Sequence, residues 1–255
     1  MLLHKRGCGF VPLVSTCNFV INCLIGHVKL DISMAIYEQF RLMGMKPNIY
    51  TYTIMIKAYR RNGCLDEAFD LAREMEREGV VPDAFTCTAL IEGLCLHWNP
   101  SFGFELLHTW RNDGVPVNAF GYNVVIHGFC REMKFQKAED VLLEMGAHGV
   151  APDAISYGSL INGYCKAGKV EEALRIFEEM KGRNMVPNKI QYTHLINGFC
   201  LLGKIHDAMK VFNEMKEMVM RPDVYTYTIM IKAYCRKGFL YEAFGLGDGE
   251  GGRRA

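Results

Sequence analysis

Six residues with hydrogen-bonding side chains recur every 35 residues and alternate between amide and carboxylate. They are Asn48, Asp83, Asn118, Asp153, Asn188 and Asp223. A carboxylate only accepts hydrogen bonds, whereas an amide both donates and accepts them. Asp and Asn are also good helix N-caps, so each of the six is expected to precede a helix. The spacing therefore predicts a structural cap, a regularly repeated polar contact, or both together.

Nothing in the sequence has the spacing of a catalytic or metal site. There is no C-x-x-C, the eight histidines share no common spacing, and no H-x-E is followed by P-C-x-x-C, the signature of zinc deaminases. Five cysteines, spaced 35 apart, are expected to be packing residues in a reducing compartment: Cys95, Cys130, Cys165, Cys200 and Cys235. We expect a protein that is not an enzyme and that holds no cofactor or metal.

The stretch from Ala154 to Asn188 shows which elements position these residues. Its apolar residues recur at helical spacing in two groups, the first from Tyr157 to Tyr164 and the second from Val170 to Phe177. Gly168 interrupts the pattern between the two groups, and Pro187 follows the second, where it cannot continue a helix. The stretch is therefore predicted to be a helical hairpin.

Copies of this hairpin fill the chain. The expected full repeats are 14–48, 49–83, 84–118, 119–153, 154–188 and 189–223, with the tail of a preceding repeat at 1–13, a truncated repeat at 224–246 and a disordered tail at 247–255. Repeat 84–118 is irregular, and its Asn99-Pro100 predicts an N-cap followed by proline at the first helical position. One hairpin is too small to form a core alone, so the predicted fold is all-α, a right-handed α-solenoid of stacked 35-residue helix-turn-helix repeats.

Charge and hydropathy exclude two general classes of partner. The net charge of +1 gives no bulk electrostatic reason for binding nucleic acid or membrane, so any polyanion site must be local. The charge-free stretch 7–28 contains Pro12 and several polar residues, so we expect no membrane helix. Neither a signal nor a transit peptide is visible in the sequence.

The repeat motif resembles that of a known family. The combination of P-D/N, TY-x-x-LI-x-G-x-C and EA-x-x-x-F-x-EM is clearest in 154–188 and 189–223. It is similar to the P class of the pentatricopeptide repeat family of plant organelle RNA-binding proteins. The resemblance implies sequence-specific binding of single-stranded RNA, one base per repeat, in organellar RNA processing, stabilisation or translation. It implies a mitochondrial location, or alternatively a chloroplast. The alternative function is that of a protein-binding helical-repeat scaffold.

The resemblance assigns base sandwiching to the second residue of each repeat. These residues are Tyr50, Phe85, Phe120, Ile155, Ile190 and Tyr225, whereas Ser15 of the first repeat cannot stack on a base. Ordinary packing at a helix start is the alternative explanation for them. Base recognition falls to the fifth and last residues, as the pairs Asn18/Asn48, Thr53/Asp83, Thr88/Asn118, Asn123/Asp153, Gly158/Asn188 and Thr193/Asp223.

These pairs imply a base preference for each repeat. Asp suits the N–H donors of guanine and uracil, and Asn suits the ring-nitrogen acceptor of adenine or cytosine. A short Thr leaves room for a purine, and a longer Asn meets a pyrimidine, so the implied site is 5′-Y-G-A-U-N-G-3′. Gly158 departs from the family pattern and leaves its base open.

Basic residues recur at the ends of the first helices. Contact with phosphate is expected for Arg61, Arg131, Lys166 and Arg236, and a solvated helix end that favours cations is the alternative. No capping helix with a polar outer face is evident at either end of the array. We therefore expect fraying of the array ends or self-association through them.

Overall fold

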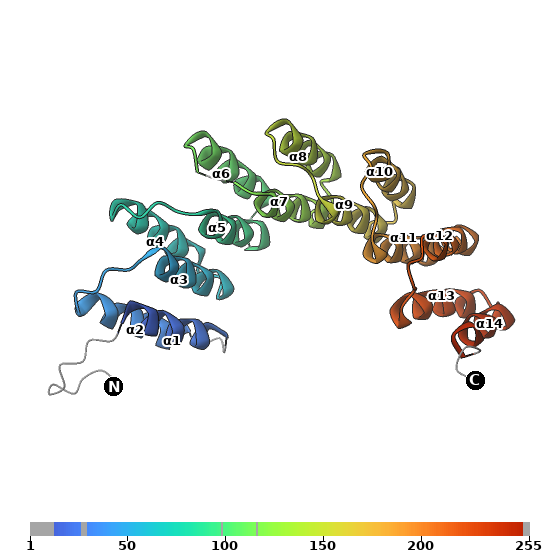
Figure 1. Cartoon of the computed structure of the whole chain (residues 1–255), viewed down its shortest axis with the longest axis horizontal. Coiled ribbons are helices and arrows are strands. Elements are labelled where there is room, and N and C mark those ends of the chain that lie inside the picture. The colour runs from blue at the N-terminus through green and yellow to red at the C-terminus, as the bar shows by residue number, and fades with distance from the viewer. Residues whose placement is uncertain (1–12, 27–29, 98, 116, 252–255) are drawn as a thin grey trace. The chain divides into compact units, whose positions relative to one another are not determined.

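The computed structural model describes residues 13–26, 30–97, 99–115 and 117–251. These residues form fourteen α-helices and no strand (Figure 1). The helices are α1 (Val14–Gly26), α2 (Leu30–Leu42), α3 (Ile49–Arg61), α4 (Leu65–Arg77), α5 (Ala84–His97), α6 (Pro100–Asn112), α7 (Ala119–Arg131), α8 (Phe135–Ala147), α9 (Ala154–Lys166), α10 (Val170–Gly182), α11 (Lys189–Leu201), α12 (Ile205–Glu217), α13 (Val224–Arg236) and α14 (Leu240–Gly251). The prediction of an all-α helical-repeat fold is confirmed.

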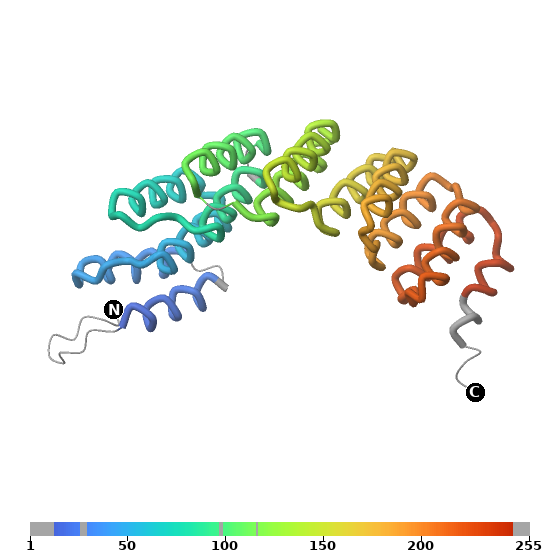
Figure 2. Tube along the Cα trace, turned by 45° about the horizontal axis from the view of Figure 1, so that its top comes forward, coloured from blue at the N-terminus to red at the C-terminus, as the bar shows by residue number. Residues whose placement is uncertain are grey.

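The helices form hairpins that stack in chain order. The chain divides within α7 into two compact halves, residues 1–128 and 129–255. In the N-terminal half the odd-numbered helices α1, α3 and α5 pack side by side, and in the C-terminal half α9, α11 and α13 do so. The second helices α2, α4, α6, α10, α12 and α14 pack on the first helix of their own hairpin. Most even-numbered helices also contact the first helix of the next hairpin, as α10 contacts α11 (Figure 2). First helices such as α3 and α11 thus lie between two neighbouring first helices, which fixes the position of their N-termini.

The core consists of residues that recur with the repeat. The fourth residues Tyr52, Tyr122, Tyr157 and Tyr192 are fully buried. The hydroxyls of Tyr157 and Tyr192 donate to Glu179 and Glu214 at 3.2 and 3.0 Å, so these phenols keep a partner inside the protein. Methionines of the second helices are equally buried and fill the space between hairpins: Met75, Met145, Met180 and Met215.

The turn inside each hairpin needs a left-handed residue. Gly168 has φ +73° there, a conformation that costs glycine little because it has no Cβ. Met133 holds the corresponding place in the next hairpin toward the N-terminus, with φ +58°. A side chain at this φ is strained, so local backbone preference does not account for this turn.

Two expectations about single elements meet different outcomes. The Asn99-Pro100 prediction is confirmed, because Asn99 Oδ1 accepts a hydrogen bond from the Ser101 N–H and Pro100 is the first residue of α6. Four of the five phased cysteines are buried, but Cys235 is exposed. The buried ones pack against the first helix of the following hairpin, as Cys165 does near Gly198, whereas the described residues include no further first helix beside α13.

The C-terminal helix is longer than expected. The sequence predicts a truncated repeat that ends at 246 and a disordered tail from 247, but α14 continues to Gly251. Helix propagation adds one hydrogen bond for each residue fixed, so a helix started by a packed turn can extend through glycines. The predicted tail at 1–13 lies almost wholly outside the described residues, as does 252–255. No described helix is both long and apolar enough to cross a bilayer.

Candidate nucleic-acid interface

The last residue of every full repeat caps the following first helix. Oδ1 of Asp83 accepts from the Thr86 N–H at 2.8 Å, and Oδ1 of Asn188 accepts from the Ile190 N–H at 2.8 Å. The other four form the same kind of bond: Asn48 to Thr51, Asn118 to Gly121, Asp153 to Ser156 and Asp223 to Thr226. The capping role is therefore confirmed. It uses Oδ1 in each case.

The fifth residues lie just beneath the surface on the same helices. Thr53, Thr88 and Thr193 are 5–7% exposed, and their hydroxyls contact the carbonyl oxygen four residues earlier at 2.6–2.8 Å. The longer Asn18 and Asn123 are 2% and 4% exposed. These fifth residues thus present only a small part of their side chains to the surface.

The structure brings fifth and last residues of one repeat together. Oγ1 of Thr193 lies 3.2 Å from Oγ1 of Thr226, which also contacts Asp223 Oδ1 at 2.9 Å. In the first repeat the contact is direct, from Asn18 Nδ2 to Asn48 Oδ1 at 3.4 Å. The paired positions expected from the sequence therefore form one polar row in these repeats.

The third residue of the following repeat takes part in this row, which spacing alone did not indicate. Thr226 and Thr86 stand between the predicted pairs. In repeat 154–188, Gln191 Nε2 lies 3.0 Å from the point where a Cβ on Gly158 would be. These third residues were missed because their contacts cross between hairpins, and a periodic pattern within one repeat does not reveal them.

The second residues form an exposed series at the starts of the first helices. Their exposed fractions range from 54% to 68% for Tyr50, Phe85, Phe120, Ile155, Ile190 and Tyr225. Residues that pack at a helix start would be covered, so this alternative does not account for the six. Each repeat from 49 onward thus presents one large apolar side chain at the start of a helix that is capped by Asp or Asn.

Asp223 has a cation beside it. Nζ of Lys189, the first residue of the same repeat, lies 2.9 Å from Asp223 Oδ2. The N–H of Thr226, and then Lys189, lower the pKa of this carboxyl to about 2. Both carboxylate oxygens of Asp223 are therefore engaged in the free protein.

The candidate phosphate-binding residues Arg61, Arg131, Lys166 and Arg236 are all exposed. Nη1 of Arg61 lies 3.5 Å from the Ile25 carbonyl oxygen of the neighbouring first helix. Lys166 lies near His194 of the next first helix, and its charge helps burial to lower the pKa of that imidazole. Arg61 and Lys166 therefore lie at the boundary between adjacent first helices.

A small cavity is lined by residues from three of the predicted classes of site residue. It has a volume of about 170 Å³ and is lined by Tyr225, Thr228 and Arg236 of α13, together with residues of α11 such as Cys200. A second, a fifth and a candidate phosphate-binding residue thus border one space. Lys232 also lines it and was missed, because it has no counterpart in the phased series of cations.

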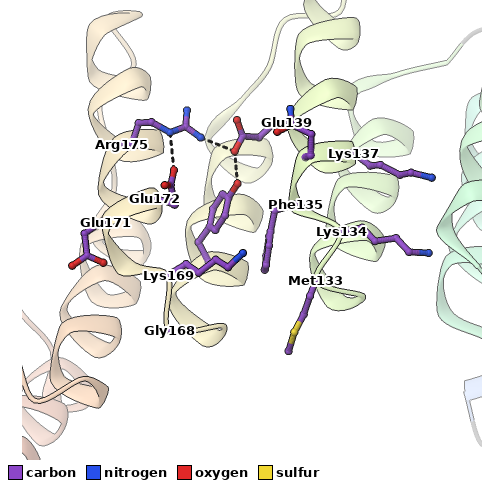
Figure 3. Close-up of a pocket in the computed structure, with 12 residues that line it drawn as sticks. Met133, Lys134, Phe135, Lys137, Glu139, Gly168, Lys169, Glu171, Glu172 and Arg175 are labelled. Carbon is purple, nitrogen blue, oxygen red and sulfur yellow. Dashed lines mark hydrogen bonds and ion pairs between the residues drawn. The ribbon is translucent and has the colours of Figure 1, made fainter.

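Another cavity, of about 910 Å³, lies on the second-helix side between α8 and α10 (Figure 3). Glu139 lines this cavity and accepts hydrogen bonds from the Tyr164 hydroxyl and, at 2.6 Å, from Arg175 Nη2. Arg175 Nε also donates to Glu172 at 3.0 Å. In Figure 3, Arg175 is thus paired with Glu139 and Glu172, and none of the predicted site residues lines this space. The described residues hold no cluster suited to a metal ion.

Comparison with known proteins gives the family and the fold. The PPR repeat family matches residues 12–61, 55–96, 117–166, 152–201 and 189–236, and the PPR repeat matches 85–115 and 225–248. A mitochondrial pentatricopeptide repeat-containing protein of Arabidopsis thaliana is 32% identical over 68 residues, which are 27% of this chain and 8% of that protein.

Solved structures have the same fold. The maize pentatricopeptide repeat protein PPR10 matches with a TM-score of 0.65 and 24% identity over 93% of this chain and 40% of its own. The structure of PPR10 in complex with an 18-nt psaJ RNA element matches with a TM-score of 0.62 over the same shares of the two chains. The PPR domain of Arabidopsis thaliana protein-only RNase P 1, in complex with tRNA, gives 0.55 at 20% identity over 70% of this chain and 94% of that domain. The chain thus spans less than half the length of PPR10. With matches along most of its length, this chain belongs to the pentatricopeptide repeat family.

Proposed function

We propose that this protein binds single-stranded RNA in a sequence-specific manner, one base per repeat, and does not act as an enzyme. The observation that carries the proposal is the exposed series of second residues, 54–68% exposed, each at the start of a helix capped by Asp or Asn. The RNA complex of PPR10 and the tRNA complex of the RNase P 1 domain support the choice of ligand.

The exposed series has the chemistry of a stacking surface. A flat or branched apolar side chain can cover one face of an unstacked base, and aromatic stacking contributes about 1–3 kcal/mol per base. Tyr50 and Phe85 come from neighbouring first helices, so a base between them would be covered on both faces. A scaffold for peptides would need a continuous apolar groove, whereas here single apolar side chains alternate with polar caps.

The polar row supplies discrimination. With the assignments from the resemblance, Thr53/Asp83 reads G, Thr88/Asn118 reads A, Asn123/Asp153 reads U and Thr193/Asp223 reads G, after a pyrimidine at Asn18/Asn48. The capping bonds orient each Asp and Asn, so their hydrogen-bonding groups are fixed before RNA arrives. The phased cations contact phosphates, which position the strand without reading it.

The uniform repeat length supports our proposal that the chain is of the P class and that its role is in organellar RNA processing, stabilisation or translation. The mitochondrial Arabidopsis relative favours the mitochondrion over the chloroplast.

Binding to labelled RNA tests the proposal directly. The protein is titrated with 5′-CGAUCG-3′, its scrambled sequence and the corresponding DNA duplex, with ultraviolet crosslinking to map the contact. Tighter binding of the matched RNA, with crosslinks at Tyr50 or Tyr225, is expected. A protein that ignores all three nucleic acids but retains a peptide ligand would show the scaffold function instead.

A further inference from the structure

Repeat 154–188 is the one full repeat whose fifth residue has no side chain. Gly158 occupies this position and is buried within α9. In the other repeats the last residue is paired with the side chain of the fifth residue. Asn188 has no such side chain at Gly158, so the pattern of the other repeats assigns no base to this one. The structure shows that the place is filled from the next hairpin.

The side chain that fills it is Gln191 of α11. Gln191 Nε2 donates to the Ala154 carbonyl at 2.7 Å. Ala154 is four residues before Gly158, and the equivalent carbonyls of Ile49 and Lys189 are contacted by the hydroxyls of Thr53 and Thr193 at 2.7 and 2.8 Å. The amide of Gln191 therefore takes over the bond that the fifth residue makes elsewhere.

The fit leaves no spare room for an ordinary fifth residue while Gln191 holds this position. A Cβ on Gly158 would lie 3.0 Å from Gln191 Nε2, so the Gln191 amide would have to shift to accommodate it. Gln191 is 2% exposed, the same as the fifth residue Asn18 of the first repeat. The glycine and the long amide thus form a complementary pair, and the amide lies at the depth of a fifth residue.

Gln191 is also connected to the last residue of the repeat. Its Oε1 accepts from the Asn188 N–H at 2.9 Å, while Asn188 Oδ1 accepts from Ile190 N–H at 2.8 Å. Among the described residues, the second N–H of Gln191 Nε2 and the Nδ2 group of Asn188 have no partner. Two amides with unused donors therefore lie side by side at this repeat.

We propose that Gln191, rather than Gly158, sets the base preference of repeat 154–188 and that the base is cytosine. This assignment rests on the proposed function. A long amide at this depth leaves room for a pyrimidine rather than a purine, as Asn18 and Asn123 do. Cytosine presents adjacent acceptors at O2 and N3, which match amide N–H donors, whereas uracil presents an N–H at position 3. The full site becomes 5′-Y-G-A-U-C-G-3′.

The test uses four RNAs that differ only at the fifth base, with the full chain and three variants. The wild-type protein is expected to prefer C by about five- to tenfold, the effect of one net hydrogen bond. The double variant Gly158→Thr with Gln191→Thr rebuilds the Thr193–Thr226 arrangement beside Asn188, so its preference should move to A. Gln191→Ser keeps a hydroxyl that can accept from the N–H of the capping residue, as the Ser156 hydroxyl does in the preceding hairpin. Its affinities for the C and A RNAs should differ by no more than about twofold.

Ser156→Thr is the matched control, because it changes a third residue in the preceding hairpin and should leave the fifth-base ranking unchanged. Thermal melting followed by circular dichroism confirms that each variant is folded. If the variants bind RNA, still discriminate at the second base and keep the wild-type ranking at the fifth, the assignment to Gln191 is overturned while the proposed function stands. If the wild-type protein shows no RNA binding at all, the proposed function fails, and this assignment fails with it.

Discussion

Oγ1 of Thr53 on α3 lies 2.6 Å from Oγ1 of Thr86 on α5, and the Thr86 hydroxyl contacts Asp83 Oδ1 at 2.8 Å. Thr53 Oγ1 also contacts the Ile49 carbonyl at 2.7 Å, so two hydroxyl protons serve three contacts. The charged acceptor is the strongest of the three, so the Thr86 proton is expected to point to Asp83. The fifth and last residues of this repeat are thereby joined into one network through a residue of the next repeat.

Asp83→Asn should move the preference at the second base from G towards A. The change turns an acceptor-only group into one that also donates, while Thr53 and its space stay the same. The expected change in relative affinity corresponds to about 1 kcal/mol. Binding to four RNAs that differ only at that base measures it.

Stability distinguishes this effect from capping. Asn caps a helix about as well as Asp, so the melting temperature of the Asp83→Asn variant should hardly change. The reciprocal variant Asn118→Asp should move the third base from A towards G. An unchanged ranking in both folded variants means that these residues cap helices and do not read bases.

Phe85→Ala should weaken RNA binding without loss of stability. The side chain is 68% exposed, so its removal leaves almost no cavity in the free protein, whereas a stacked base loses about 1–3 kcal/mol of contact. Leu143→Ala on α8 is the control, since Leu143 is 59% exposed on a second helix that carries no predicted site residue. Equal affinities for the two variants would argue against stacking at Phe85.

If the four phased cations contact phosphates, affinity should fall with salt along a log–log slope of roughly −3, about −0.7 per contact. Lys166→Gln should reduce the slope by about 0.7 and weaken matched and mismatched RNAs alike, because phosphates carry no base identity. Lys210→Gln is the control, because Lys210 lies on the second helix α12 and pairs with Asp207 at 3.1 Å. A flat salt profile contradicts the phosphate role.

The sequence predicts what repeats with the period and misses what crosses between repeats. The helix starts and the caps at Asn48 to Asp223 follow from local preferences that act within a few residues, so spacing was sufficient to find them. Gln191 and Lys189 were not identified, because their roles depend on which atoms of the neighbouring helix they reach. The predicted end of the last helix was also wrong. A glycine-rich composition indicates a low helix preference, but it does not show the packing that starts α14.

The protein should lose stability as the pH falls below about 6.5. Burial, and then the charge of Lys166, lower the pKa of His194, and its Nδ1 has no partner among the described residues. The unfolded chain therefore binds a proton at a higher pH than the folded chain, so the free energy of unfolding decreases as the pH falls through this range. Urea unfolding at pH 8 and pH 5.5 should show a smaller difference for His194→Gln than for wild type.

The same change at exposed His206 is the control for this measurement. A pH dependence that is identical in wild type, His194→Gln and His206→Gln would show that another group is responsible. RNA binding is measured in parallel, because Lys166 is itself a candidate phosphate contact.

The last hairpin should be the least protected part of the C-terminal half. Of the side chains of α14 that the structure describes, Ala243 is buried, while Tyr241 is 90% and Phe244 is 73% exposed. Local opening costs little free energy where few apolar contacts are lost, so the amides of α14 should exchange faster than those of α12, in which Phe212 and Met215 are buried. Hydrogen exchange followed by mass spectrometry measures this in the monomer at low concentration.

At high concentration the exposed side chains should instead bring copies together, and protection of α14 should rise as the sedimentation coefficient rises. Tyr241→Ser with Phe244→Ser should abolish the association while the exchange of α12 stays the same. Protection of α14 equal to that of α12 in a protein that sediments as a monomer at every concentration would contradict both fraying and self-association.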